Sequence, residues 1–79
     1  MVLNIEKITI YVRLLDEGTE VMRPVQALKL ASNCYELLPP KDYDPEFETW
    51  EFEPGRIVRC KTHIVGNETI LVASCQCDI

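Results

Sequence analysis

The first third of the chain alternates between apolar and polar residues. Over residues 7–15 the letters KITIYVRLL place an aliphatic residue at every even position from 8 to 14, with Thr, Tyr or Arg at the odd positions between them. A two-residue period is typical of a half-buried β-strand. The letters DEGTE follow at 16–20 and predict a turn, in which Gly18 takes the positive φ that other residues avoid.

A second strand is predicted over residues 21–30, although Pro24 interrupts it. Proline has no N–H to donate to a strand ladder, so its position should be an edge or a bulge. The apolar positions also change parity between Val25 and Leu28. One extra bulged residue would reconcile the two parities, and we therefore expect this strand to bend near Pro24.

The rest of the chain repeats the pattern of short strands and turns. Further strands are predicted at 34–38, 47–53, 56–65 and 69–77, with turn signals at 31–33, 39–46, 54–55 and 66–68. Trp50 and Phe52 share one parity and are expected in the core. Turn signals every ~8–12 residues and no sustained helical period indicate an all-β barrel or sandwich. Residues 25–38 can also be drawn as a helix, an alternative that the β-branched and turn residues on their flanks disfavour.

The chain length favours the smaller of these architectures. With 79 residues, positions 1–79 form a single domain with a thin core. A strongly bent barrel of five or six antiparallel strands closes its edges with the least chain.

The order of elements carries a family resemblance. A glycine turn, a long bent strand, the aromatic pair in "TWEF", the connection "EPGR" and a final strand pair resemble a Src-homology-3-like barrel, in the broad sense that includes Tudor and KOW types. The stretch from Ile8 to Ser74 also resembles small stand-alone uncharacterised bacterial proteins. The resemblance implies the fold and no activity. The chain lacks the acidic "ALYDY"-type opening of proline-rich-peptide binders, so that ligand class is not expected.

Charge and hydropathy narrow the possible partners. The net charge is −5 and the pI about 4.7, so the chain has no general attraction to phosphate backbones or anionic lipid. No stretch approaches the ~20 apolar residues of a membrane span, and the N-terminus does not read as a signal peptide. We therefore expect a bacterial cytoplasmic protein with reduced thiols, no membrane contact, and a monomeric or weakly dimeric state.

Four cysteines offer a possible thiolate site. Cys34, Cys60, Cys75 and Cys77 lack the C-x-x-C spacing of zinc knuckles. The simplest interpretation makes Cys34 and Cys60 small core residues and leaves Cys75 and Cys77 as semi-exposed thiols. Two alternatives stay open. These are a metal or redox site at Cys75 and Cys77, and a disulfide between Cys60 and Cys75.

No catalytic constellation is evident. His63 is the only histidine, and strand parity places it on the face opposite Cys60. A catalytic pair of cysteine and histidine needs a third residue to orient the histidine, and the sequence offers no candidate for that role. Neither a G-x-S-x-G motif nor a glycine-rich phosphate loop occurs. The sequence therefore predicts no catalytic residue, no enzyme activity and no cofactor.

Acidic residues gather between Asp42 and Glu53, where six carboxylates face one lysine. Charge of one sign steers partners of the opposite sign. We therefore predict a protein-interaction surface for a partner with a basic face, with a solvated loop as the alternative. The predicted surface comprises Asp42, Tyr43, Asp44, Glu46, Glu48 and Glu51.

A short basic strip lies further along the chain. Arg59, Lys61 and His63 alternate on one face of a predicted strand, with Arg56 just before it. Outward charge of this kind protects an edge strand from pairing with other chains. It could also contact an acidic partner or nucleic acid, although the overall acidity makes nucleic acid the weaker expectation.

Overall fold

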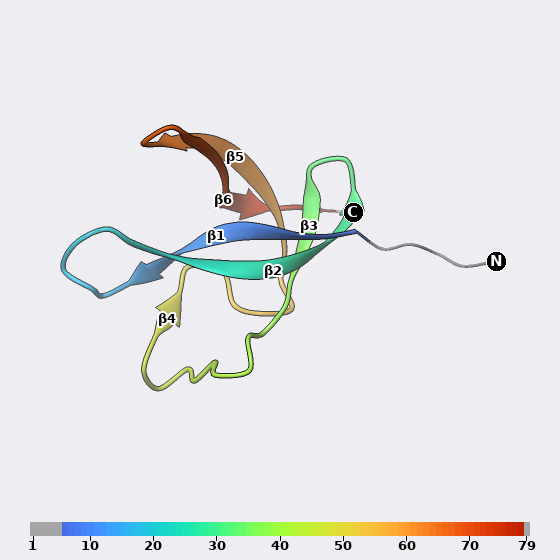
Figure 1. The fold of residues 1–79 in the computed structure, drawn as a ribbon. Helices are drawn as coiled ribbons and strands as arrows, with labels where there is room; N and C mark the ends of the chain where they lie inside the picture. Colours follow the sequence, from blue (N-terminus) through green and yellow to red (C-terminus); the bar gives the residue numbers. More distant parts are fainter. Residues whose placement is uncertain (1–5, 79) are drawn as a thin grey trace.

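The computed structural model describes residues 6–78 and is built entirely from strands, turns and loops. The strands are β1 (Lys7–Leu15), β2 (Val21–Ala31), β3 (Cys34–Leu37), β4 (Thr49–Trp50), β5 (Ile57–Val65) and β6 (Glu68–Gln76) (Figure 1). The all-β prediction is thus confirmed, and the helical alternative for residues 25–38 is wrong. Within the described part of the chain, no helix is long and apolar enough to cross a membrane.

The strands form one mixed sheet whose hydrogen bonding runs ring-like through five of them. The order is β2-β3-β5-β6-β1-β4, and β2 pairs with β1 as well. The ring closes where β1 meets β6 at the pair Tyr11 and Val72. This contact is parallel, so the prediction of purely antiparallel strands is wrong. Strand β4 lies outside the ring and pairs with the end of β1, Leu14 opposite Trp50.

The alternation in β1 produces the expected two faces. Ile10 and Val12 are fully buried, and Ile8 and Leu14 at the two ends are half-buried and pack against the core. Burying an aliphatic side chain of this size stabilises the fold by about 1.5–3 kcal/mol. The core also contains Val25, Ala27, Tyr35, Leu37, Trp50, Val58, Cys60 and Ala73. As predicted, Phe52 packs against this core beside Trp50.

Pro24 lies at a position of β2 where the strand ladder does not require a backbone N–H. The ladder between β1 and β2 runs in unbroken register through the pair Tyr11 and Pro24. On its other side, β2 pairs with β3 only from Ala27 onward. The edge interpretation of Pro24 is therefore confirmed. The bulge expected there is wrong, because the register of β2 shifts between Lys29 and Ala31 instead.

A disulfide links Cys34 at the start of β3 to Cys77, which follows β6. The two Cα atoms are 5.8 Å apart, and the Cys77 N–H donates to the carbonyl of Ile57 at 2.9 Å. Three predictions are corrected. Cys34 is not a free core thiol, Cys77 is buried rather than semi-exposed, and Cys60 and Cys75 are free cysteines rather than a disulfide pair.

Candidate interaction surfaces

The acidic loop, residues 42–53, is a series of turns rather than the strand predicted from residue 47 onward. The Phe47 N–H donates to the Asp44 carbonyl at 3.0 Å, and the Glu46 N–H donates to the Asp44 carboxylate at 2.9 Å. Only Thr49–Trp50 is extended. Such local bonds compete with a strand ladder, which explains why the alternation of this segment did not produce one.

Arg23 of β2 holds the loop from the side. Its Nη1 and Nη2 atoms lie 2.5 Å from a Glu48 carboxylate oxygen and 2.6 Å from an Asp42 carboxylate oxygen. The indole N–H of Trp50 donates to the same Glu48 oxygen at 2.9 Å. The hydrogen bond to Glu48, followed by that to Asp42, raises the pKa of Arg23 above its ordinary value. Two of the predicted interaction residues therefore stabilise the loop from within.

Some of the remaining residues of the predicted surface contact other side chains of the protein, and others have no ion-pair partner among the described residues. Glu51 lies 3.9 Å from Arg13, which also pairs with Glu20 at 3.1 Å. Tyr43 meets Trp50 edge to face, with ring centroids 4.9 Å apart. Among the loop carboxylates, Asp44, Glu46 and Glu53 have no cation within 4.0 Å in the described residues. The surface available to a partner is thus smaller than the sequence suggested.

Phe47 is the prominent residue of the loop that the predicted surface omitted. Its side chain is 84% exposed, the highest value among the large apolar residues that the structure describes. Its parity offered a signal: in FETWEFE it falls with Glu51 and Glu53, on the side opposite Trp50. Its ring is therefore accessible to a partner.

A small hollow lies beside the loop. Its volume is about 160 Å³, and its walls include the rings of Tyr43 and Trp50 and the side chains of Glu48 and Glu53. Aromatic rings and carboxylates together favour a cation. The hollow has room for the end of one side chain rather than for a small-molecule substrate.

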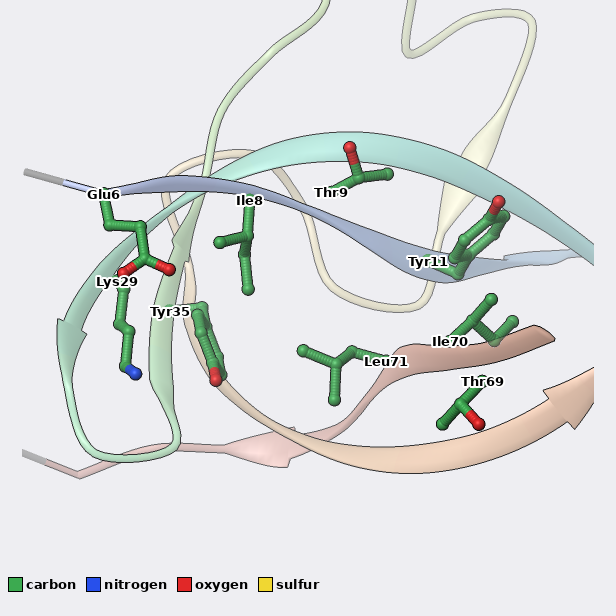
Figure 2. Close-up of a pocket in the computed structure, with 9 residues that line it drawn as sticks. All are labelled: Glu6, Ile8, Thr9, Tyr11, Lys29, Tyr35, Thr69, Ile70 and Leu71. Atoms are coloured by element: carbon green, nitrogen blue, oxygen red, sulfur yellow. The ribbon is translucent and has the colours of Figure 1, made fainter.

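A larger groove opens between β1 and β6, away from every residue predicted as a site. Its volume is about 510 Å³. The side chains of Ile8, Tyr35 and Leu71 lie in the space between the two strands, whereas Thr9 points away from it (Figure 2). Lys29 lies at one end of the groove. The groove arises where two strands far apart in the chain diverge.

The basic strip on β5 remains unpaired. Arg59 and Lys61 are exposed and His63 is half-buried, and their cross-strand neighbours on β6 are Cys75, Val72 and Ile70, none of which is acidic. In the part of the chain that the structure describes, none of these three side chains has a carboxylate within 4.0 Å. Arg56 instead donates to the side chain of Gln76 at 3.1 Å.

Of the two free cysteines, Cys60 is buried and Cys75 is exposed. Burial, followed by the nearby charge of Cys75, raises the pKa of the Cys60 thiol to about 11. A thiol with this pKa stays protonated at neutral pH and is a poor nucleophile. The disulfide also removes Cys77 from the proposed pair with Cys75. Among the described residues, no group of three or more His, Cys, Asp and Glu side chains is placed to hold a metal ion.

Comparison with known proteins adds no relative. The chain matches no protein-family model, no curated protein and no solved structure. The interpretation of its surfaces therefore rests on their geometry and charge.

Proposed function

We propose that this protein is a non-enzymatic interaction module that docks a basic segment of a partner protein through its acidic loop, with Phe47 as the anchor. The observation that carries the proposal is the 84% exposure of Phe47 on a loop that Arg23 holds at Asp42 and Glu48. Aromatic residues often supply most of the binding energy of an interface. A loop that is already ordered loses little conformational entropy when it binds.

The chemistry around Phe47 specifies the partner. The carboxylates of Asp44, Glu46 and Glu53 have no internal cation and attract positive charge. The 160 Å³ hollow beside Tyr43 suits the head group of a lysine or arginine from the partner. We therefore expect a partner segment that places an apolar contact on Phe47 and a cation in the hollow.

The same proposal includes the finer fold assignment. Ring-like pairing through five short strands and the sequence resemblance over residues 8–74 both support a place among the Src-homology-3-like barrels. Members of that broad group need no catalytic residue to bind a partner, so the assignment accords with a binding role.

The test compares capture by two exposed-residue variants. Phe47→Ala removes the anchor, and Ile64→Ala, at a residue 78% exposed on the β5–β6 hairpin, is the matched control. Bait proteins immobilised at equal density are exposed to a lysate of the native host, and captured proteins are quantified by mass spectrometry. We expect the wild type and Ile64→Ala to retain a partner with a basic surface, and Phe47→Ala to lose it at least about tenfold.

Two control measurements test whether the loss of capture comes from the acidic loop. Raising the salt concentration should weaken capture, because the loop contributes charge. Unchanged melting temperatures should show that neither substitution affects folding. Equal capture by the wild type and Phe47→Ala would rule out the acidic loop as the docking surface.

A further inference from the structure

The ring of strands is closed by a single pair, which leaves backbone groups unused on β1. The Lys29 N–H donates to the Glu6 carbonyl, so even-numbered residues of this strand direct their backbone groups toward β2. Odd-numbered residues point the other way, as Arg13 shows when its carbonyl accepts from the N–H of Glu51, just after β4. Among the described residues, Lys7 and Thr9 therefore direct N–H and C=O groups away from β2 without a strand partner on that side, and Thr9 lines the groove.

Strand β6 presents a second free edge across the groove. In a parallel pair, the residues on either side of Val72 direct their backbone groups to Tyr11 of β1. Two residues earlier along the same edge, Thr69 points in the same direction and has no pairing with β1 in the described structure. The groove is thus bordered by two parallel strand edges that have separated.

The space between these edges suits an extended peptide. Its volume of about 510 Å³ falls in the ~300–1,000 Å³ range of ligand sites. Ile8 and Leu71 are half-buried there and Tyr35 is buried behind them, so the floor is apolar (Figure 2). Free strand edges beside an apolar floor are what a bound β-strand needs, because the edges supply main-chain bonds and the floor accepts alternate side chains.

Charge fixes the direction of such a peptide. Lys29 lies at the end of the groove where β1 begins (Figure 2), and no carboxylate lies within 4.0 Å of its ammonium group in the described residues. A strand antiparallel to β1 runs toward Lys29 and brings its carboxyl end there. Because β1 and β6 are parallel, the same strand is antiparallel to both. Glu6 is the one acidic residue that lines the groove, and it lies at the same end.

We propose that the groove between β1 and β6 binds the extended C-terminal segment of a partner protein, antiparallel to both strands, with its terminal carboxylate at Lys29. The segment pairs with the free backbone groups of Lys7, Thr9 and Thr69. This site is separate from the acidic loop.

The test uses two defined peptides and backbone amide NMR. Acetyl-Thr-Val-Thr-Val-Thr-Val is titrated into the isotope-labelled protein once with a free carboxylate and once as the C-terminal amide. We expect shift changes and slowed hydrogen exchange at the amides of Lys7, Thr9 and Thr69. The free carboxylate should bind up to about fivefold more tightly than the amide, the range of an exposed ion pair.

Charge variants separate this arrangement from its alternatives. Lys29→Glu should abolish the preference for the free carboxylate, and Glu6→Gln should strengthen it by removing a like charge. Lys61→Glu, the same change on the basic strip, is the matched control and should alter neither. Phe47→Ala should bind the peptide normally, which distinguishes failure of this proposal from failure of the acidic-loop proposal.

Other outcomes would overturn the proposal. These are the absence of shifts at millimolar peptide, equal binding of carboxylate and amide, or shifts confined to residues 42–53. Protection of the same amides in the free protein, together with a dimeric mass in sedimentation, would assign the edges to a second copy of the chain. Leu71→Arg blocks the floor and should prevent binding, and the exposed Lys29 substitution remains informative if that core-margin variant does not fold.

Discussion

The Cys34–Cys77 disulfide should supply a large share of the stability of this domain. The bond joins residues 43 positions apart. In the chain-entropy description, closing a loop of this length removes roughly 13 cal/mol/K from the unfolded state, which corresponds to about 4 kcal/mol at 25 °C. Reduction of the bond should therefore lower the free energy of unfolding by about 4 kcal/mol.

That loss is large beside the total. At ~0.05–0.15 kcal/mol per residue, a chain of 79 residues has a free energy of unfolding of roughly 4–12 kcal/mol. The free energy of unfolding of the reduced protein should thus lie between about zero and about two-thirds of that of the oxidised protein. Small domains with thin cores commonly depend on such a cross-link.

Urea unfolding followed by Trp50 fluorescence measures the effect directly. Trp50 is the only tryptophan and is buried, so its emission reports loss of the core. With a slope near ~1 kcal/mol/M for a small domain, reduction should lower the urea midpoint by roughly 3–4 M. Cys34→Ala combined with Cys77→Ala should behave like the reduced protein. Cys75→Ala, at an exposed free cysteine, should stay within about 0.5 kcal/mol of the wild type.

Two results would refute this reasoning. Four reactive thiols in the unfolded, unreduced protein would mean that the bond does not form. An unchanged midpoint after complete reduction, verified by mass, would mean that the loop closure contributes nothing. If the bond forms as the structure has it, an oxidising compartment is favoured over the reducing cytoplasm expected from the sequence.

Two further predictions concern Arg23 and Cys60. Among the described residues, Arg23→Met leaves Glu48 with the Trp50 indole as its one side-chain donor, so we expect the free energy of unfolding to fall by about 1–3 kcal/mol. Thermal unfolding measures this loss at ~4–8 °C per kcal/mol. A similar loss in Arg59→Met, at a cation without an acidic partner in the described residues, would argue against the Arg23 clamp. Burial raises the pKa of Cys60 in the folded protein from 9.0 to about 11, so the contribution of its neutral thiol to folding stability is fully present below pH 9. The free energy of unfolding should then fall by roughly 2–3 kcal/mol as the pH rises to 11. Cys60→Ala should flatten that decline, and an identical decline in this variant would assign it to other groups.

Local patterns were enough to predict every strand except β4, where turns replace most of the strand expected over residues 47–53. The alternation over residues 7–15 and the positive φ of Gly18 depend only on neighbouring residues, and both occur as expected. The edge position of Pro24 is likewise confirmed, whereas the bulge expected there is not. A missing N–H predicts an edge wherever the strand lies, but the bulge depends on the partner strand, and β3 imposes it after Lys29 instead.

Contacts that depend on the curvature of the sheet could not be predicted from the sequence. Cys34 and Cys77 meet although β5 lies between their strands in the sheet order, because the bent sheet brings the start of β3 beside the end of β6. The Arg23 clamp reaches residues 19 and 25 positions away. Composition placed six carboxylates in the acidic loop, but only the folded chain shows which of them already have a partner.

The groove between β1 and β6 and the Cys34–Cys77 disulfide lie at opposite ends of β6. Beyond Val72, toward its C-terminus, β6 is held by the Cys77 disulfide and by the Cys77 N–H on Ile57. In the described residues before Val72, β6 pairs only with β5, in a hairpin (Figure 1). Ile64 and Val65 at the tip of this hairpin are exposed.

A strand inserted between β1 and β6 needs ~4.8 Å on each side, so these edges must stand roughly 10 Å apart near Thr9. We expect the hairpin to provide this width by pivoting about the pair of Tyr11 and Val72, because the described part of β6 before Val72 has no pairing with β1. Because the disulfide lies beyond Val72 and the groove lies before it, reduction should lower stability without itself opening the groove.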